Sequence, residues 1–216
     1  MKPKRIFIIR HGQSLANADI HAHATIPDWK IPLTELGTLQ SGVAGTYIAD
    51  KIGNEKLGVY ISPFERTKKT WRYMANNIPG HQIVFEKEDP RVREQEWGHL
   101  RVAEEYDVID KERDEYGTFF YRIPDGESGA DVYDRCTGFL DTLYRDFKKE
   151  DFPENVLIVT HGYTMRVLLM RWFHWTVEHF HNLGNSKNCQ IVELNLNDNG
   201  KFDLITPWPL KTSNPK

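Results

Sequence analysis

Cysteines and long apolar runs are scarce in this chain. Only Cys136 and Cys189 occur among its 216 residues, and their spacing matches neither a CxxC pair nor another metal-ligand pattern. This scarcity excludes a disulfide framework and a cysteine-based zinc site. The first apolar run, residues 6–9, ends at Arg10 and is too short for a signal peptide or a membrane span. We therefore expect a cytoplasmic location and no membrane partner.

An excess of one charge is also missing. Lys and Arg number 28 and Asp and Glu number 31, which gives a net charge of −3 with the two signs interspersed. The chain has no basic stripe of the kind that binds nucleic acid, so a nucleic-acid partner is not expected. Internal repeats are absent from the sequence, and its length suits one domain over residues 1–216. Nothing in the sequence predicts the oligomeric state.

Hydrophobic patterning predicts an α/β fold. Three short apolar runs, at residues 5–9, 57–61 and 156–159, are typical of buried parallel strands, and a helical pattern follows each. Such alternation is typical of a three-layer sandwich, with a mostly parallel central sheet and helices on both of its faces. Ligands of such sheets bind beyond the carboxyl ends of the strands.

Helix-start signals place the other elements. Helices are expected from Thr34 to about residue 51 and at residues 63–76, 129–149 and 162–173, a weaker strand at 81–86, and a hairpin at 189–196 and 202–206. Thr34 is expected to be the N-cap of the first helix. Ser62, Pro63 and Glu65 predict a capping box, with proline at the first helical position.

Two long loop segments, called the first and second excursions, interrupt this pattern at residues 18–33 and 89–128. The first holds prolines, histidines and a tryptophan. The second is rich in charged and aromatic residues, and a helix is expected within it at about 103–116. Long excursions of a compact α/β domain usually serve as lids or binding loops. We therefore expect both excursions to lie over a ligand site.

Two of the three strong strands end in the same dipeptide. Arg10-His11-Gly12 follows the first strand and Thr160-His161-Gly162 follows the last. Because the carboxyl ends of parallel strands share one edge of the sheet, the two histidines are expected to meet there. Glycine after each histidine permits a tight turn into a helix, whose backbone N–H groups face an anion. Gly162 is therefore a candidate phosphate-binding residue.

Arginines add positive charge at the same edge. Arg10 precedes the first histidine, and Arg66 lies one turn into the helix that follows the 57–61 strand. Two guanidinium groups and two histidines match the charge and the oxygens of a phosphoryl group. A neutral imidazole of His11 can attack phosphorus and form a phosphohistidine that water then hydrolyses, with no need of a metal ion.

A general acid is required to protonate the leaving oxygen. Glu94, in the second excursion, is the first candidate, with Glu96 and Glu127 as alternatives. His21 and His23 lie two apart near Asp19 and invite a metal site, but neighbouring loop histidines are more often simply exposed. We expect neither a metal nor another cofactor.

Five motifs, in family order, make the chain resemble the histidine phosphatase superfamily, the phosphoglycerate mutase-like proteins. They are Arg10-His11-Gly12-Gln13-Ser14 with Asn17, Ser62-Pro63-x-x-Arg66-Thr67, Arg93-Glu94-x-x-x-Gly98, Gly126-Glu127-Ser128 and Thr160-His161-Gly162. Five ordered motifs are far more specific than one tripeptide. The resemblance implies a phosphoglycerate mutase-like fold, a phosphohistidine at His11 and no metal.

The resemblance also assigns roles to the other motif residues. It implies that Arg10, Arg66 and His161 hold the phosphoryl group and that Asn17 assists them. It further implies that Glu94 acts first as acid and then as base. Gln13 stands where the family's first motif often has Glu, and we count it among the phosphate-binding residues.

Both phosphatases and mutases belong to the superfamily. Residues 120–128 resemble the bisphosphatase segment more than the mutase one, and the chain is shorter than typical mutases, which favours the phosphatase branch. Tyr121 and Arg122 lie where the related bisphosphatases hold the organic part of the substrate, so the resemblance implies that they contact the substrate. The expected activity is hydrolysis of small phosphorylated metabolites, and the sequence does not name the substrate.

Two alternative functions stay open. One is a phosphoglycerate-type phosphomutase, whose activity would depend on a bisphosphate primer. The other is a regulatory module that binds phosphoproteins or dephosphorylates them. The intact set of His11, His161, both arginines and Glu94 argues against a scaffold without activity.

Overall fold

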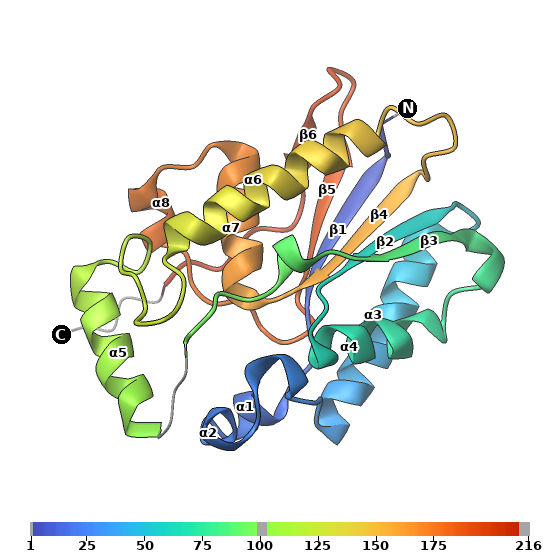
Figure 1. Ribbon diagram of the computed structural model, residues 1–216. Coiled ribbons are helices and arrows are strands. Elements are labelled where there is room, and N and C mark those ends of the chain that lie inside the picture. The colour runs from blue at the N-terminus through green and yellow to red at the C-terminus, as the bar shows by residue number, and fades with distance from the viewer. Residues whose placement is uncertain (1, 99–102, 212–216) are drawn as a thin grey trace.

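A single six-stranded sheet forms the centre of the protein in a computed structural model, which describes residues 2–98 and 103–211. The strands are β1 Arg5–Arg10, β2 Leu57–Ile61, β3 Ile83–Glu88, β4 Asn155–Thr160, β5 Ile191–Leu196 and β6 Phe202–Leu204. Their order is β3-β2-β4-β1-β5-β6; the first four strands pair in parallel, and β5 pairs antiparallel with both β1 and β6 (Figure 1). The predicted parallel sheet and C-terminal hairpin are both confirmed.

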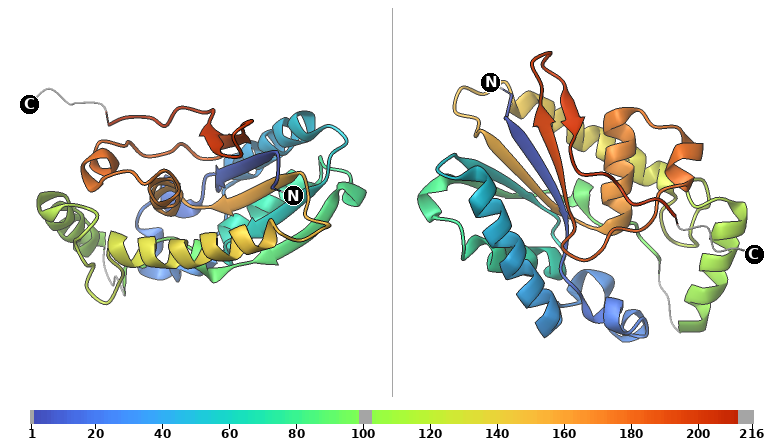
Figure 2. Two further views of the ribbon diagram at one scale, coloured as in Figure 1. Left: turned by 90° about the horizontal axis from the view of Figure 1, so that it is seen from above. Right: turned by 180° about the vertical axis from the view of Figure 1, so that it is seen from behind.

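Helices cover both faces of the sheet. The longer ones are α3 Glu35–Ile52, α4 Glu65–Ala75, α5 Ala103–Tyr116, α6 Gly129–Asp146 and α7 Gly162–Phe173. Viewed from above, α3 and α6 lie on opposite sides of the strands (Figure 2). The described part of the chain contains no helix long and apolar enough to cross a membrane.

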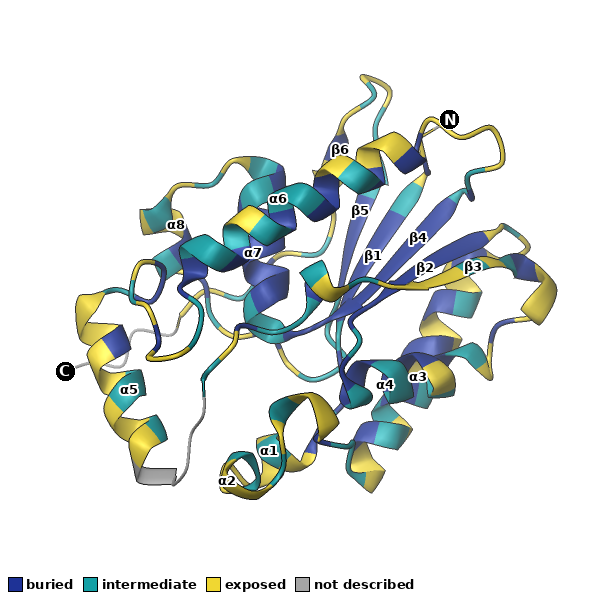
Figure 3. Cartoon of the chain, in the orientation of Figure 1, coloured by how far each residue is buried: buried dark blue, intermediate teal, exposed yellow. Residues whose placement is uncertain are grey.

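Alternation along β1 explains the two helical layers. Ile6 and Ile8 belong to the core shared with α6 and α7, whereas Phe7 and Ile9 belong to the core shared with α3 and α4. Successive side chains of a strand point to opposite faces, so a strand that is apolar throughout must be covered on both. The central strands are accordingly buried, and the edge strand β3 is more exposed (Figure 3). The predicted three-layer α/β sandwich is confirmed.

Helix α3 begins as predicted, and α6 begins with a capping box of its own. The Thr34 side chain accepts a hydrogen bond from the backbone N–H of Gly37, three residues into the turn. Ser128 and Asp131 exchange hydrogen bonds at the start of α6. Each cap satisfies backbone N–H groups that lack a partner within the helix.

The predicted start of α4 was wrong. The helix begins at Glu65 rather than at Pro63, and Ser62 is not its N-cap. The Ser62 hydroxyl lies 2.7 Å from Nε2 of His161 instead. Both side chains are fully buried, and a buried ring nitrogen that loses its partner costs more than an unfilled cap at a helix end.

Strand β3 begins two residues later than predicted. Residues Gly80–Gln82 form a 3-10 turn, in which the buried Gln82 side chain donates hydrogen bonds to the carbonyls of Gly53 and Glu55. These bonds hold residue 82 against the end of α3, and strand pairing starts only after it. Propensity alone does not reveal such a side-chain contact.

Both excursions lie near the carboxyl ends of the parallel strands. Helix α1 Leu15–Ala18 leads into the first, which carries the short helix α2 Ala22–Thr25, and the second carries α5 (Figure 1). Residues 99–102 of the second excursion lie outside the described part of the chain. Helix α5 coincides with the predicted helix at 103–116.

Candidate active site

Strand register brings the two histidines together. Arg10 of β1 pairs with Thr160 of β4, and the backbone N–H of His11 donates to the Thr160 carbonyl at 3.0 Å. The next residue of each strand is therefore a histidine at the same edge of the sheet. Their ring centroids lie 5.2 Å apart with an interplanar angle of 64°.

The His11 ring is held in one orientation. Its Nδ1 lies 2.7 Å from the carbonyl oxygen of Gly12, an acceptor, which assigns the proton to Nδ1 and leaves a lone pair on Nε2. Burial, followed by the charges of Arg66 and Arg10, lowers the pKa of His11 well below its usual value. The ring is therefore neutral near pH 7.

Gly12 allows this arrangement to pack against α3. A Cβ at residue 12 would lie 2.4 Å from the carbonyl oxygen of Gly37 and 2.9 Å from Oγ of Ser41. No side chain fits at such a separation, so the turn after His11 requires glycine.

His161 is held by Ser62 and is more deeply buried. Burial, together with the charge of Arg66, lowers the pKa of His161 well below its usual value. Its second ring nitrogen, Nδ1, is buried and has no hydrogen-bond partner among the described residues. A buried polar atom without a partner is uncommon in proteins and marks a place where a ligand can supply one.

Arg10 and Ser186 each have a buried atom without a hydrogen-bond partner among the described residues, as His161 does. Nε of Arg10 and Oγ of Ser186 are likewise buried without a partner in the described chain. Both atoms lie near Gly162, since a Cβ there would be 3.4 Å from the first and 3.3 Å from the second. Arg10 also donates through a terminal nitrogen to the Ser186 carbonyl at 2.5 Å. Burial lowers the pKa of Arg10, whereas Glu94 acts in the opposite direction.

A cavity of about 180 Å³ lies over Arg10 and His11, and its described lining does not include His161 or Gly162. Among the predicted site residues, its lining includes Arg10, His11, Asn17, Arg66 and Glu94. The excursions contribute further lining residues, among them Ile20, His23, Asp28, Trp97 and Tyr106. The Trp97 and Tyr106 rings stack with centroids 4.6 Å apart. Both predicted binding loops thus reach the candidate site.

Arg66 already has an anionic partner in this arrangement. Its two terminal nitrogens donate to the two carboxylate oxygens of Asp28, at 2.9 Å and 3.2 Å. One of them also donates to the Asp28 carbonyl at 2.6 Å. A carboxylate held in this bidentate way shows that the guanidinium is oriented to hold an oxyanion.

Glu94 lies at the amino end of α7. Its carboxylate accepts hydrogen bonds from the backbone N–H groups of Tyr163 and Thr164, and from the Thr164 hydroxyl at 3.0 Å. The first-turn N–H groups of a helix attract anions, and here they fix the carboxylate at the wall of the cavity.

The competing carboxylates lie elsewhere. Glu127 forms ion pairs with Arg93 and Arg135. Glu96 lines a neighbouring cavity but not the one that contains His11. Geometry therefore favours Glu94 for a role beside His11.

Asn17 lies at the cavity wall, whereas Gln13 points away. Asn17 Oδ1 accepts from the Ser14 hydroxyl and from the Asn188 amide, so its own amide nitrogen can face a ligand. Oε1 of Gln13 instead accepts from the Thr34 hydroxyl at 2.9 Å, at the start of α3. The structure does not bring the Gln13 side chain into the cavity.

The residues expected near the organic part of the substrate are also turned away. The Tyr121 hydroxyl donates to Glu112 at 2.6 Å, and Arg122 pairs with Asp131 at 2.7 Å. Neither residue is among those that line the two cavities. Both pairs are exposed, and they fix these side chains outside the site.

Several residues of the site were not predicted from the sequence, and three of them make specific contacts there. Asp28 pairs with Arg66, Ser62 holds His161, and Tyr106 packs on Trp97. The prolines and polar residues of the 18–33 excursion indicated a binding loop but not which residue would contact Arg66. His23 lies 3.5 Å from Asp28, and the described residues contain no group of three or more His, Cys, Asp or Glu placed to hold a metal ion.

The chain matches known proteins over most of its length. It is 40% identical over 217 residues to a phosphoglycerate mutase-like protein of Arabidopsis thaliana, covering 94% of this chain and 77% of that protein. It is 28% identical over 310 residues to the broad-range acid phosphatase of Saccharomyces cerevisiae, covering 100% of this chain and 90% of that enzyme.

Solved structures share the fold. The mycobacterial glucosyl-3-phosphoglycerate phosphatase, in a structure with VO3, superposes with a TM-score of 0.72 at 19% identity, covering 93% of this chain and 96% of that one. The sequence profile of the histidine phosphatase superfamily (branch 1) matches residues 6–205. By this match and by its relatives, the chain belongs to the histidine phosphatase superfamily.

Proposed function

We propose that the protein is a phosphomonoester phosphatase that acts on small phosphorylated metabolites through a phosphohistidine at His11. The observation that carries this proposal is the state of the His11 ring. The ring is neutral, its Nδ1 is fixed on the Gly12 carbonyl, and it lines a cavity shared with Arg10 and Arg66. An oriented neutral imidazole beside two guanidinium groups is suited to attack a bound phosphoryl group.

In the first step, Nε2 of His11 attacks phosphorus and the bond from phosphorus to the leaving oxygen breaks. Glu94, at the cavity wall, gives its proton to that oxygen, and the alcohol leaves. Arg10 and Arg66 neutralise the equatorial oxygens, and His161 adds a hydrogen bond from its Nδ1. The phosphoryl group is then bonded to His11.

In the second step, water attacks the phosphohistidine. Glu94 now accepts a proton from the water, the bond from phosphorus to Nε2 breaks, and inorganic phosphate leaves. His11 returns to its neutral form, because burial and two arginines disfavour its protonation. Glu94 thus serves first as acid and then as base.

Arg66 has to exchange partners during this cycle. Its guanidinium holds the Asp28 carboxylate in this structure and would hold phosphoryl oxygens in a complex with substrate. The two arginines supply the positive charge that a metal ion provides in other phosphatases, and the proposal is therefore a metal-independent reaction.

Relatives and cavity size support hydrolysis of small substrates. One relative is the broad-range acid phosphatase of yeast, and another, 29% identical over 174 residues, is a metal-independent phosphoserine phosphatase of Arabidopsis thaliana. The cavity over His11 adjoins a second one of about 540 Å³, and together they suit a small molecule.

Hydrolysis of phenyl phosphate near pH 6, with chelator present, tests the proposal. Wild-type protein should release phosphate, and His11→Asn should lower kcat by several orders of magnitude while the protein stays folded. Equal activity of the two proteins would refute the role of His11. Activity that appears only with a bisphosphate primer would establish a phosphomutase instead.

A further inference from the structure

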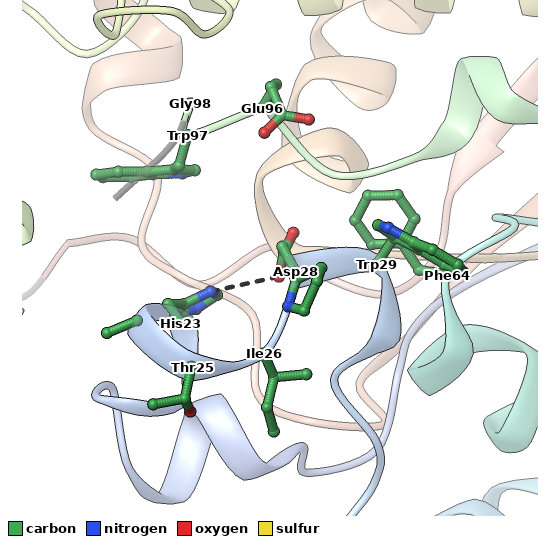
Figure 4. Close-up of a pocket in the computed structure, with 11 residues that line it drawn as sticks. His23, Thr25, Ile26, Asp28, Trp29, Phe64, Glu96, Trp97 and Gly98 are labelled. Atoms are coloured by element: carbon green, nitrogen blue, oxygen red, sulfur yellow. Dashed lines mark ion pairs between the residues drawn. The ribbon is translucent and has the colours of Figure 1, made fainter. Parts of the chain in front are cut away.

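A second cavity adjoins the one over His11. It has a volume of about 540 Å³, and the two cavities share His23, Asp28 and Trp97 in their linings. In Figure 4, Glu96 and Trp97 lie across the cavity from His23 and Asp28. A molecule whose phosphoryl group lies over His11 would therefore extend its remaining part into this space.

The wall of the second cavity combines aromatic rings with negative charge. Trp29, Trp97 and Phe64 line it together with the carboxylates of Asp28 and Glu96 (Figure 4). Its described lining residues include no lysine or arginine, but Nζ of Lys30 lies 4.8 Å from the Trp29 ring centroid and Cζ of Arg66 lies 4.9 Å from that of Phe64. Burial, with the nearby carboxylates of Asp28 and Glu127, raises the pKa of Glu96. Within the described lining of this cavity, negative charge thus exceeds positive charge. Asp28 pairs with Arg66 of the neighbouring cavity, and Arg93 acts on the pKa of Glu96 in the opposite direction.

Phosphate binding would make this imbalance larger. Arg66 neutralises Asp28 through two hydrogen bonds. Once phosphoryl oxygens take the guanidinium of Arg66, the Asp28 carboxylate loses its partner. A positive group elsewhere on the same substrate would replace that partner, and a negative group would be repelled.

We propose that the second cavity binds the leaving group of the substrate and selects leaving groups that carry a positive charge and no negative charge. The inference rests on the proposed phosphatase activity and deepens it by naming a substrate class, the phosphomonoesters of amino alcohols and of phenols that carry an aminoalkyl group. Aromatic walls suit this class, because ring faces attract cations as well as apolar groups. Asp28 is the residue that determines the selectivity.

Three phenyl phosphates of matched reactivity test the charge selection. They carry a para side chain of similar length that is cationic in tyramine O-phosphate, neutral in 4-ethylphenyl phosphate, and anionic in the phosphate of 3-(4-hydroxyphenyl)propanoate. We expect kcat/KM to fall in that order, with at least about a tenfold ratio between cation and anion at low salt. The ratio should shrink as ionic strength rises.

Asp28→Asn assigns the selectivity to a residue. It should reduce the cation-to-anion ratio by about tenfold. The substitution also frees Arg66 from its ion pair with Asp28, which should change KM for all three substrates alike. The cation-to-anion ratio of kcat/KM therefore isolates the effect in the second cavity. Asp19→Asn removes the same charge from the same excursion, outside both cavity linings, and should leave the ratio unchanged.

The aromatic wall is tested separately. Trp29→Ala should lower kcat/KM for tyramine O-phosphate about two- to fivefold. Tyr47→Ala removes an exposed ring of α3 and should have no effect.

The outcomes separate this inference from the proposed function. Equal kcat/KM for the three substrates would overturn the charge selection and leave the phosphatase activity standing. A cation-to-anion ratio of kcat/KM in Asp28→Asn that equals the wild-type ratio would overturn the role of Asp28. Failure to hydrolyse any of the three would refute the proposed function and, with it, this inference.

Discussion

Replacing Ser62 with alanine should destabilise the protein and misplace His161. The Ser62 hydroxyl lies 2.7 Å from Nε2 of His161, and both side chains have 0% exposure. The other ring nitrogen has no partner among the described residues, so the variant would leave both nitrogens unsatisfied. An unsatisfied buried group costs about 1–3 kcal/mol, which for a chain of this length is about 2–4 °C in Tm per kcal/mol.

Thermal and urea unfolding measure the stability change, and phosphate release measures the activity. We expect kcat/KM to fall by up to about 100-fold, because a shifted ring no longer holds the phosphoryl group. Ser41→Ala is the matched control. It removes another fully buried hydroxyl, which donates to a carbonyl of its own helix and whose loss leaves no buried nitrogen unpaired.

A double-mutant cycle isolates the hydrogen bond. In a His161→Phe background the Ser62→Ala change should cost less than in the wild type, with a coupling of about 1 kcal/mol or more. A free energy of unfolding that Ser62→Ala leaves unchanged to within about 0.5 kcal/mol would refute the reasoning.

Three further predictions concern metal, the general acid and pH. Dialysis against chelator should leave kcat unchanged. If dialysis abolished activity and added metal restored it, the proposal that two arginines supply the positive charge in place of a metal ion would be contradicted. Glu94→Gln should lower kcat for alkyl phosphates about 10²–10⁴-fold, measured by phosphate release. The loss should be much smaller for 4-nitrophenyl phosphate, because its leaving oxygen needs no proton. Equal losses of kcat for the two substrates would exclude an acid role of Glu94. The lowered pKa of buried His11 means that the unfolded chain binds more protons below about pH 6.5. The free energy of unfolding should therefore fall as pH drops below about 6.5. His11→Asn should reduce the slope of unfolding free energy against pH by up to about 1.4 kcal/mol per pH unit. An unchanged slope would mean that the His11 ring is not held neutral.

Local pattern and strand register were enough to predict the centre of the site. The tripeptides around His11 and His161 each end a buried strand, and parallel pairing of Arg10 with Thr160 makes the next residues neighbours. Arg66 follows β2 at the same edge of the sheet, whereas Glu94 lies in the second excursion and was assigned by its motif. Residues fixed by the ends of regular elements can be placed without knowledge of the loops.

Contacts between distant loops could not be predicted in the same way. Asp28 meets Arg66 only because residues 18–33 fold back over α4, and the sequence carries no periodic signal for that path. Ser62 was misassigned because a serine followed by proline and glutamate is typical of a helix cap, whereas a buried histidine 99 positions later is its partner. Tyr121 and Arg122 were assigned by resemblance alone, and each has a carboxylate partner outside the site.

The most direct test of the account is to trap the phosphorylated enzyme. Rapid quenching of wild-type protein with a ³²P-labelled aryl phosphate, followed by peptide mapping under alkaline conditions that preserve phosphohistidine, locates the label. The account predicts label on His11, formed and lost within the time of one turnover, and none in His11→Asn. Label on another residue, or steady turnover with no labelled protein at any time, would contradict it.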